Sequence, residues 1–203
     1  PAVRERVEVR GYIDSALWID AEPLGHHLAS GDEHVGFYGF ADVTKGVASF
    51  ANVTHLGAEC AARWGGAEQW RCLFGEYRLP LVRTPYMAIG SQFDTYQMDN
   101  DFGTCGHWGC YPHTPAEVQY AWGLANRTAD LARALAVGQR FLYSSRCHRH
   151  AVSLSTWQFV MPGCGGLSLQ AALRTPLDSN PPPPTFGTGA ACCRNKCGLL
   201  LLT

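Results

Sequence analysis

The residues best suited to chemistry in this sequence are an acid and two histidines, each just beyond an apolar run. Asp94 stands four residues after residues 85–90, and His148 and His150 follow residues 140–144. A carboxylate that contacts an imidazole orients the ring and stabilises its protonated form, and the imidazole can then take a proton from a nucleophile. The spacing therefore predicts acid–base chemistry, provided that the fold brings the acid and a histidine together.

The apolar runs are expected to be strands of one parallel sheet. Residues 85–90 form a short apolar run between breakers, which is typical of a buried parallel strand, and residues 140–144 form the next strand. A further strand is expected earlier in the chain, where the alternating residues 6–10 lead into the apolar residues 11–20.

A long helix is predicted between the last two strands. Thr114 is a suitable N-cap, Pro115 takes the first helical position, Glu117 completes a capping box, and an apolar stripe continues to Gly138. A strand, a helix and a strand in this order form a βαβ unit, which places the acid and the histidines at the carboxyl edge of the sheet, where ligands bind. Acid before histidine is also the chain order of the α/β-hydrolase triad. Another helix is predicted at residues 41–55.

The composition is that of an ordinary globular protein. Of the 203 residues, 46% are hydrophobic and 16% charged, which excludes a disordered chain and a coiled coil and suffices for one domain with its own core. The formal net charge of −1 provides no field that would attract nucleic acid or an anionic membrane. No apolar run is long enough to span a bilayer. We therefore expect neither nucleic acid nor a membrane among the partners, and no motif indicates a cofactor.

The nine cysteines admit two interpretations, disulfides in a secreted protein or a zinc site in a cytosolic one. Zinc would be held by Cys105, His107, Cys110 and His113, or by Cys147 with the two histidines that follow it. Because no regular Cys-x-x-Cys pair is present, we predict no metal site, and the zinc site stays an alternative.

Two glycosylation sequons support the disulfide interpretation. Asn52 and Asn126 each begin an Asn-x-Thr acceptor, which fits passage through an oxidising secretory compartment. We therefore predict a secreted protein, extracellular or in the cell wall, in which a disulfide holds an irregular segment at residues 65–81. The odd number of cysteines leaves one without a partner in this chain. The predicted disulfides join two pairs, Cys60 with Cys72 and Cys105 with Cys110.

Several segments of the chain, taken in order, are similar to the motifs of one enzyme family. Residues 11–20 are similar to an Asp-(Ala/Ser)-Gly-aromatic-aromatic segment, residues 68–75 to a Cys-aromatic-Phe segment, and residues 92–97 to a Tyr/Phe-Asp-x-x-Gln turn. The long helix follows, and residues 143–150 resemble a Ser-Cys-x-x-His segment. These motifs are those of the pectin acetylesterase and Notum family of secreted carboxylesterases, and the resemblance covers roughly residues 6–175.

The resemblance implies an α/β fold, an α/β-hydrolase-like and mostly parallel sheet of which this chain is the carboxyl-terminal part only. Asp94 would be the acid of the catalytic triad, and His150 would be the base, because it has the family's three-residue offset from Cys147. Ala151 departs from the plant pectin acetylesterases, which have a second cysteine at that place. The rim of the substrate pocket would comprise Trp18, Tyr96, Gln97 and Trp157.

The third member of a triad, the nucleophilic serine, is not found. None of the ten serines lies in a Gly-x-Ser-x-Gly motif, and the one half match, at Ser168, follows His150, which is the wrong order. In the family the serine precedes the segment matched by residues 6–20, so we expect this chain to be part of a longer esterase. We accordingly predict a partial hydrolase domain at residues 1–177 and a Pro-rich, cysteine-containing tail at residues 178–203.

The first functional hypothesis is a carboxylic ester hydrolase that acts by a Ser-Asp-His mechanism and lacks its nucleophile in this chain. Its substrate would be an esterified, pectin-like polysaccharide or an acylated protein, and the sequence does not decide between them. The alternatives are a non-catalytic pseudoenzyme or carbohydrate-binding module, and the zinc-binding module described above.

Overall fold

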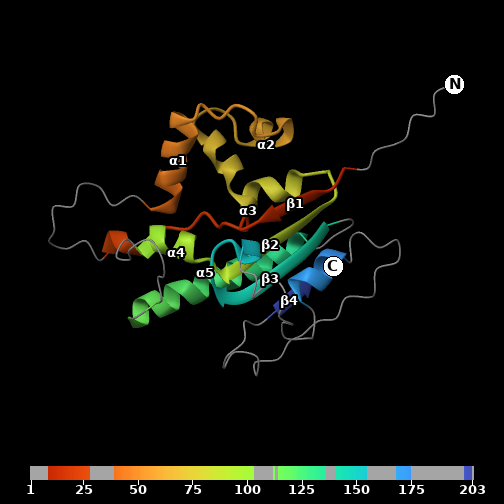
Figure 1. Ribbon diagram of the computed structural model, residues 1–203. Coiled ribbons are helices and arrows are strands. Elements are labelled where there is room, and N and C mark those ends of the chain that lie inside the picture. Colours follow the sequence, from red (N-terminus) through yellow and green to blue (C-terminus); the bar gives the residue numbers. More distant parts are fainter. Residues whose placement is uncertain are drawn as a thin grey trace.

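The computed structural model describes residues 9–27, 39–102, 112, 114–135, 140–154, 168–174 and 199–202. Its centre is a four-stranded sheet in the order β1, β2, β3, β4, in which the first three strands run parallel (Figure 1). The mostly parallel α/β sheet predicted from the sequence is thus confirmed. The strands are β1 (Gly11–Asp14), β2 (Tyr86–Phe93), β3 (Arg140–His148) and β4 (Leu199–Leu202).

β2 is the buried centre of the sheet, and its sequence explains why. Every residue from Tyr86 to Phe93 is buried. Tyr86 pairs with Gly11 on one side and with Arg140 on the other, and a strand between parallel neighbours needs apolar residues along most of its length. The strand continues beyond the predicted run, so that its carboxyl end lies directly before Asp94.

The leucines at the end of the sequence form β4, although we expected them in a tail. β4 pairs antiparallel with β3, with Leu202 opposite Leu142 and Leu199 opposite Ser145. A run of leucines contains no proline or charge that would prevent backbone pairing at a sheet edge. The Pro-rich residues before it gave no indication of a strand.

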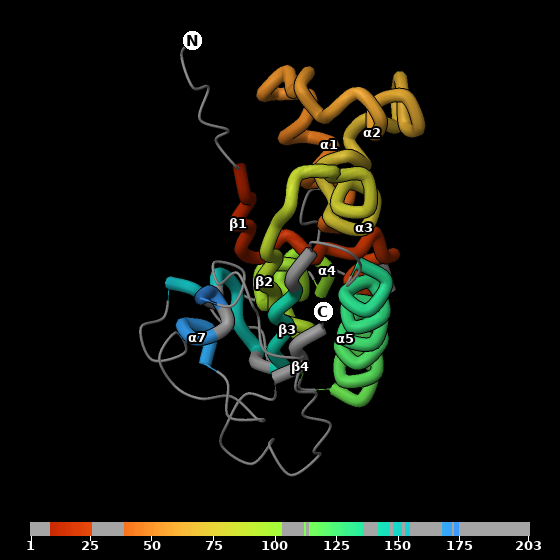
Figure 2. Tube along the Cα trace, turned by 90° about the vertical axis from the view of Figure 1, so that its right-hand side faces the viewer, coloured from red at the N-terminus to blue at the C-terminus, as the bar shows by residue number. Residues whose placement is uncertain are grey.

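Helices cover the sheet. α5 (Pro115–Leu135) packs against β2 and β3 and lies along one face of the sheet (Figure 2). Its predicted capping box is confirmed: the Thr114 N–H donates to Glu117 Oε2 (2.9 Å), and the Glu117 N–H donates to Thr114 Oγ1 (3.2 Å).

No helix within the described ranges is long and apolar enough to cross a membrane. The other helices are α1 (Phe40–Phe50), α2 (Ala58–Arg63), α3 (Gly75–Arg78), α4 (Thr95–Phe102) and α7 (Leu169–Arg174), with 3₁₀ helices η1 (Leu24–His27), η2 (Gly66–Leu73), η3 (Leu79–Leu81) and η4 (Val152–Leu154).

α1 ends before the predicted boundary at residue 55. Its last residue is Phe50, and Asn52 has a φ of 47°, a left-handed conformation with which a right-handed helix cannot continue. Asparagine is one of the few residues that adopt this conformation without a large cost. No glycine or proline marks the position in the sequence, and the predicted helix was therefore too long.

The predicted disulfide between Cys60 and Cys72 is confirmed. It joins α2 to η2 with α-carbons 5.9 Å apart, and both cysteines are buried. A cross-link over a loop of this length stabilises the fold by about 3 kcal/mol, because it reduces the entropy of the unfolded chain. Residues 65–81, expected to be irregular, contain the short helices η2, α3 and η3. Cys105 and Cys110, the second predicted pair, lie outside the described residues.

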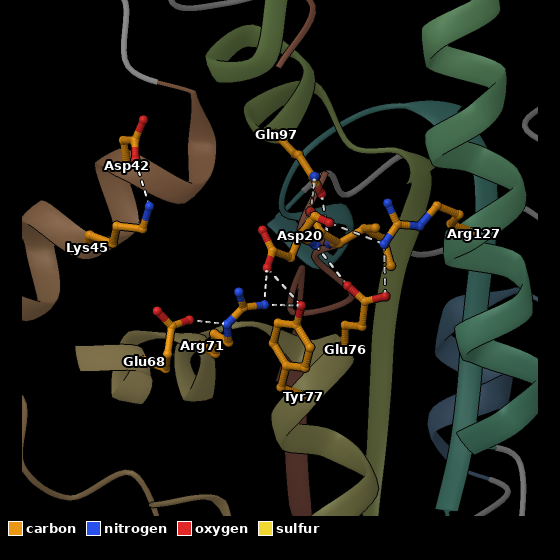
Figure 3. Close-up of polar contacts among 10 residues, drawn as sticks. Asp20, Asp42, Lys45, Glu68, Arg71, Glu76, Tyr77, Gln97 and Arg127 are labelled. Carbon is orange, nitrogen blue, oxygen red and sulfur yellow. Dashed lines mark hydrogen bonds and ion pairs between the residues drawn. The ribbon is translucent and has the colours of Figure 1, made fainter. Parts of the chain in front are cut away.

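A polar network ties these short helices to the segment after β1 (Figure 3). Oδ2 of Asp20 accepts hydrogen bonds of 2.7 Å from Arg71 Nη1 and from the Tyr77 hydroxyl. The backbone N–H of Asp20 donates to Glu76 (2.9 Å), which also pairs with Arg127 of α5 (3.0 Å). Burial, together with the bond to Asp20, raises the pKa of Tyr77 to about 12. Arg127 also donates to the carbonyl of Asp20 (3.2 Å), so η2, α3 and α5 all contact Asp20 and hold the segment that leads to it in one position.

Candidate active site

Asp94 and His150 lie together at the carboxyl ends of β2 and β3. Asp94 directly follows β2, and His150 is the second residue after β3. The ring nitrogen Nδ1 of His150 lies 3.1 Å from Oδ2 and 3.2 Å from Oδ1 of Asp94. The predicted hydrogen-bond contact between this acid and this histidine is confirmed. His148 does not take that position, because its ring stacks on Phe93 with centroids 4.7 Å apart.

The carboxylate of Asp94 is held by the start of α4. Its Oδ1 accepts hydrogen bonds of 3.0 Å from the backbone N–H groups of Tyr96 and Gln97, and its carbonyl accepts one from Met98. Asp94 is thus the N-cap of α4, where a carboxylate satisfies N–H groups that the helix leaves unpaired. Since Asp94 is also buried, its carboxylate has little freedom to turn away from His150.

The pKa of His150 is raised above its ordinary value. The hydrogen bond to Asp94 is the largest cause, partial burial of the ring opposes it, and the charges of Asp94 and Asp14 act in the same direction as the hydrogen bond. Because Nδ1 faces the carboxylate, we assign the ring proton there, and Nε2 is then the nitrogen that can take a proton from a nucleophile. The arrangement suits an orienting acid and a base in a hydrolytic site.

Asp14 and Ser15, at the end of β1, hold the loop that carries His150. The hydroxyl oxygen of Ser15 accepts a hydrogen bond of 2.6 Å from the Ala151 N–H and donates one of 3.0 Å to Asp14 Oδ1. Oδ2 of Asp14 accepts a hydrogen bond of 2.8 Å from the Ser153 N–H and another from the Ser153 hydroxyl. These hydrogen bonds join the end of β1 to the loop after β3, although β1 and β3 are not neighbours in the sheet.

Ser15 and Ala151, which are joined by one of these hydrogen bonds, both have backbone conformations that residues other than glycine rarely adopt. The φ angle is 58° at Ser15 and 52° at Ala151. Such conformations persist where surrounding contacts compensate for their cost. The Arg149 N–H also donates to the carbonyl of Phe93 (3.2 Å), so His150 is anchored through the residues on both of its sides.

We expect Ser15→Gly to loosen this anchor without changing the backbone conformation, because glycine adopts positive φ readily. Loss of the hydroxyl removes the acceptor of the Ala151 N–H, so hydrogen exchange of that amide should become about tenfold faster. The amide of Arg149, which bonds to a carbonyl of β2, is an internal control and should keep its rate. Unchanged protection of Ala151 in NMR exchange measurements would show that the hydroxyl does not hold the loop.

Aromatic side chains lie around the imidazole. Trp18 is nearly parallel to the His150 ring, with centroids 6.3 Å apart and 14° between the planes, and the Tyr96 ring lies 5.0 Å away. Phe40 of α1 contacts Trp18 (5.0 Å) and Tyr96 (5.7 Å) edge to face. Tyr96 remains 44% exposed, so the rings offer an apolar surface beside the base.

Of the residues predicted at the pocket rim, Trp18 and Tyr96 lie beside the imidazole. Gln97 is buried and bonds to the backbone of Ile19: its Nε2 donates to the carbonyl (2.6 Å) and its Oε1 accepts the N–H (3.1 Å). Gln97 therefore positions the segment that carries Trp18. Trp157 lies outside the described residues.

Three residues that the structure brings to the site are not marked by any local pattern in the sequence. Phe40 begins α1 and reaches the site only through the fold, so no local pattern marks it. Asp14 and Ser15 lie in residues 11–20, which carry part of the family resemblance. That resemblance was the available signal for both of them.

Ser15 has one property of a catalytic serine, a strained turn directly after a strand. Its side chain is 4% exposed, however, and its hydroxyl is engaged by Asp14 and Ala151. It also lacks the flanking glycines of a nucleophile elbow. The contacts of Ser15 therefore describe a structural role.

A metal centre finds no support in the described part of the chain. Among those residues, no group of three or more His, Cys, Asp or Glu side chains could hold a metal ion. The first set of zinc ligands considered from the sequence, Cys105, His107, Cys110 and His113, lies outside the described residues.

The sheet order, the helical crossover and the acid–histidine pair define part of an α/β-hydrolase fold. The solved structures that match this chain include the Wnt deacylase Notum from Drosophila, with a TM-score of 0.62 and 22% sequence identity. The match covers 82% of this chain and 41% of the Notum chain, so this chain spans less than half of that structure. The resemblance indicated by the sequence is confirmed at the level of the fold, which is partly Notum-like. No protein-family model matches the sequence, and no curated protein matches it either.

Proposed function

We propose that this chain is part of a carboxylic ester hydrolase, in which Asp94 orients His150 and His150 acts as the general base. The observation that carries the proposal is the contact of 3.1 Å between His150 Nδ1 and Asp94 Oδ2. The partial Notum-like fold supports it, and so does the resemblance in sequence between the segments that hold these two residues and the family's triad motifs.

In the proposed reaction, Nε2 of His150 takes the proton of a serine hydroxyl while the serine oxygen forms a bond to the carbonyl carbon of the ester. The protonated imidazole, held by Asp94, then gives this proton to the departing alcohol oxygen as the ester C–O bond breaks. Water next attacks the acyl-serine, and His150 takes a proton from the water and returns it to the serine oxygen. The products are an alcohol and a carboxylic acid.

We infer that the serine comes from polypeptide outside these 203 residues. None of the ten serines lies in a Gly-x-Ser-x-Gly motif, and Ser15, which has the strained conformation, is buried and hydrogen-bonded. Most of the Notum structure has no counterpart in this chain, since the match covers 41% of it. The activity therefore belongs, in this proposal, to a longer protein.

The aromatic rings beside the base favour an ester with an apolar acyl group. Trp18 and Tyr96, which Phe40 supports from below, provide the surface on which such a group would lie. The similar protein Notum is a Wnt deacylase, and removal of an acyl group from a protein is accordingly favoured over deacetylation of a pectin-like polysaccharide. The Cys60–Cys72 disulfide is consistent with action outside the cell.

The test is to read the coding sequence upstream of the Pro1 codon and to compare the 203-residue chain with the extended protein. The chain alone should neither hydrolyse 4-nitrophenyl octanoate nor react with a fluorophosphonate probe. The extended protein should do both, through a serine in a Gly-x-Ser-x-Gly motif. Labelling of any serine in the 203-residue chain would contradict the proposal. An extended protein without a reactive serine would also contradict it, and would indicate a pseudoenzyme or a carbohydrate-binding module.

A further inference from the structure

The turn after α1 presents an acceptor for N-linked glycosylation. Asn52 and Thr54 are exposed, whereas Val53 between them is half-buried and packs against the cluster around Leu56. The N–H of Asn52 donates to the carbonyl of Ser49 (3.2 Å), and the left-handed φ of Asn52 turns the chain away from the helix. The two residues that an acceptor must present are therefore both on the surface.

The second sequon has different surroundings. Asn126 lies in the middle of α5, and Thr128, whose hydroxyl belongs to the acceptor, is 4% exposed. Arg127, between them, donates to Glu76 and to the carbonyl of Asp20. In the folded protein, a transferase could reach this acceptor only if α5 opened and these contacts broke. The structure thus separates two sequons that the sequence alone treats as equal.

An exposed aromatic ring lies beside the first sequon. Phe50, two residues before Asn52, is 95% exposed, and no described core cluster includes it. Sugars present C–H groups that pack against the negative face of an aromatic ring. The α-carbons of Phe50 and Asn52 are at most about 7 Å apart along the chain, which is within the reach of a sugar attached to the asparagine.

We propose that Asn52 carries an N-linked oligosaccharide whose first N-acetylglucosamine packs on the ring of Phe50. In the modification, Nδ2 of Asn52 forms a bond to C1 of the sugar and loses a proton. The bond between C1 and the diphosphate of a lipid-linked oligosaccharide donor breaks, and the lipid diphosphate leaves. A transferase of the secretory pathway supplies the donor. This site is independent of the proposed ester hydrolysis.

The position of Asn52 leaves the candidate active site open. Phe40, at the start of α1, contacts Tyr96 beside the imidazole, and the helix then spans about 16 Å to its other end. Figure 1 shows that end of α1 well away from the sheet. A glycan on Asn52 would therefore stand clear of His150.

The first experiment is secretion of the full chain from insect cells behind a cleavable signal peptide, followed by peptide-N-glycosidase F and mass spectrometry. Wild type and Asn126→Gln should each release one glycan, and Asn52→Gln should release none. Thr54→Val, which removes the acceptor hydroxyl and keeps the asparagine, should also release none. An unmodified Asn52 in the secreted wild type, or a glycan on Asn126 alone, would overturn the proposal.

The second experiment tests the contact with Phe50, whose exposure means that Phe50→Ala should not disturb the fold. Deglycosylation should lower the Tm of the wild type by about 2–4 °C, and that of Phe50→Ala by less than about 1 °C. Val118→Ala, which removes a different exposed apolar side chain on α5, should keep the wild-type shift. Equal shifts in wild type and Phe50→Ala would show that the sugar does not pack on the ring.

Discussion

Asp94→Asn should lower the pKa of His150 and, in a protein that contains the nucleophile, lower kcat by about 10⁴-fold. The raised pKa depends first on the hydrogen bond between Nδ1 and the Asp94 carboxylate. Asparagine keeps the size of the side chain but has no charge, and its NH₂ group cannot accept the Nδ1 proton, so the ring is free to take the unproductive tautomer. NMR titration of the imidazole measures the pKa in the 203-residue chain without any need for activity.

The same pair makes stability depend on pH. A histidine whose pKa is higher in the folded than in the unfolded protein stabilises the fold fully below the unfolded value, about 6.5, and this contribution is lost as the pH rises through the folded value. The wild type should therefore exceed Asp94→Asn in unfolding free energy by more at about pH 6 than at about pH 9. The imidazole of His150 is 35% exposed, so solvent weakens the effect. Urea titrations at the two pH values measure it.

Two other acids give matched controls for this result. Asp130 is exposed on α5 and pairs with Arg133, so Asp130→Asn should leave the pKa of His150 unchanged. Asp14 raises the pKa of His150 by its charge and also accepts a hydrogen bond from Ser153 in the loop after His150, and Asp14→Asn should lower the pKa by less than Asp94→Asn does. An identical pKa of His150 in wild type and Asp94→Asn would remove the main support for the proposed base.

The contact between Asp94 and His150 could be predicted because local sequence patterns mark the elements that position the two residues. Residues 85–90 identify a buried strand by composition, and the capping box at Thr114 identifies the start of the crossover helix. The rule that parallel strands joined by a helix end at the same edge then brings the acid and the histidine together. The three-residue offset from Cys147, which comes from the family resemblance, chose His150 over His148.

Other parts of the site could not be predicted, because they depend on contacts between distant residues. Phe40 reaches the imidazole through its packing against Trp18 and Tyr96, and nothing near it in the sequence indicates this. The hydroxyl of Ser15 accepts a hydrogen bond from the Ala151 N–H, and the two residues are 136 positions apart in the sequence. The left-handed conformations of Ser15 and Ala151 could not be predicted either, since neither serine nor alanine favours positive φ in isolation.

The second large effect is expected at Gly75, the first residue of α3. A Cβ at this position would lie 1.8 Å from the carbonyl oxygen of Ala16, a contact with backbone that no rotamer change can relieve. Gly75→Ala should therefore push α3 away from the segment after β1 and break the hydrogen bond from the Glu76 N–H to the carbonyl of Trp18 (3.2 Å). We expect a loss of about 4 kcal/mol in unfolding free energy, above the usual range for overpacking because the obstacle is backbone.

Gly123→Ala is the matched control for this substitution, because Gly123 lies in α5 and a Cβ there would meet no atom within 4 Å. Alanine is the better helix former, so this variant should gain about 0.5–1 kcal/mol. Urea unfolding measures both variants, and the NMR signal of the Trp18 indole N–H reports whether its surroundings change in the folded state of Gly75→Ala. If Gly75→Ala were as stable as the wild type, α3 would not be held against residues 16–18. In that case, the contacts with Phe40 and Tyr96, and not α3, would position the Trp18 ring beside His150.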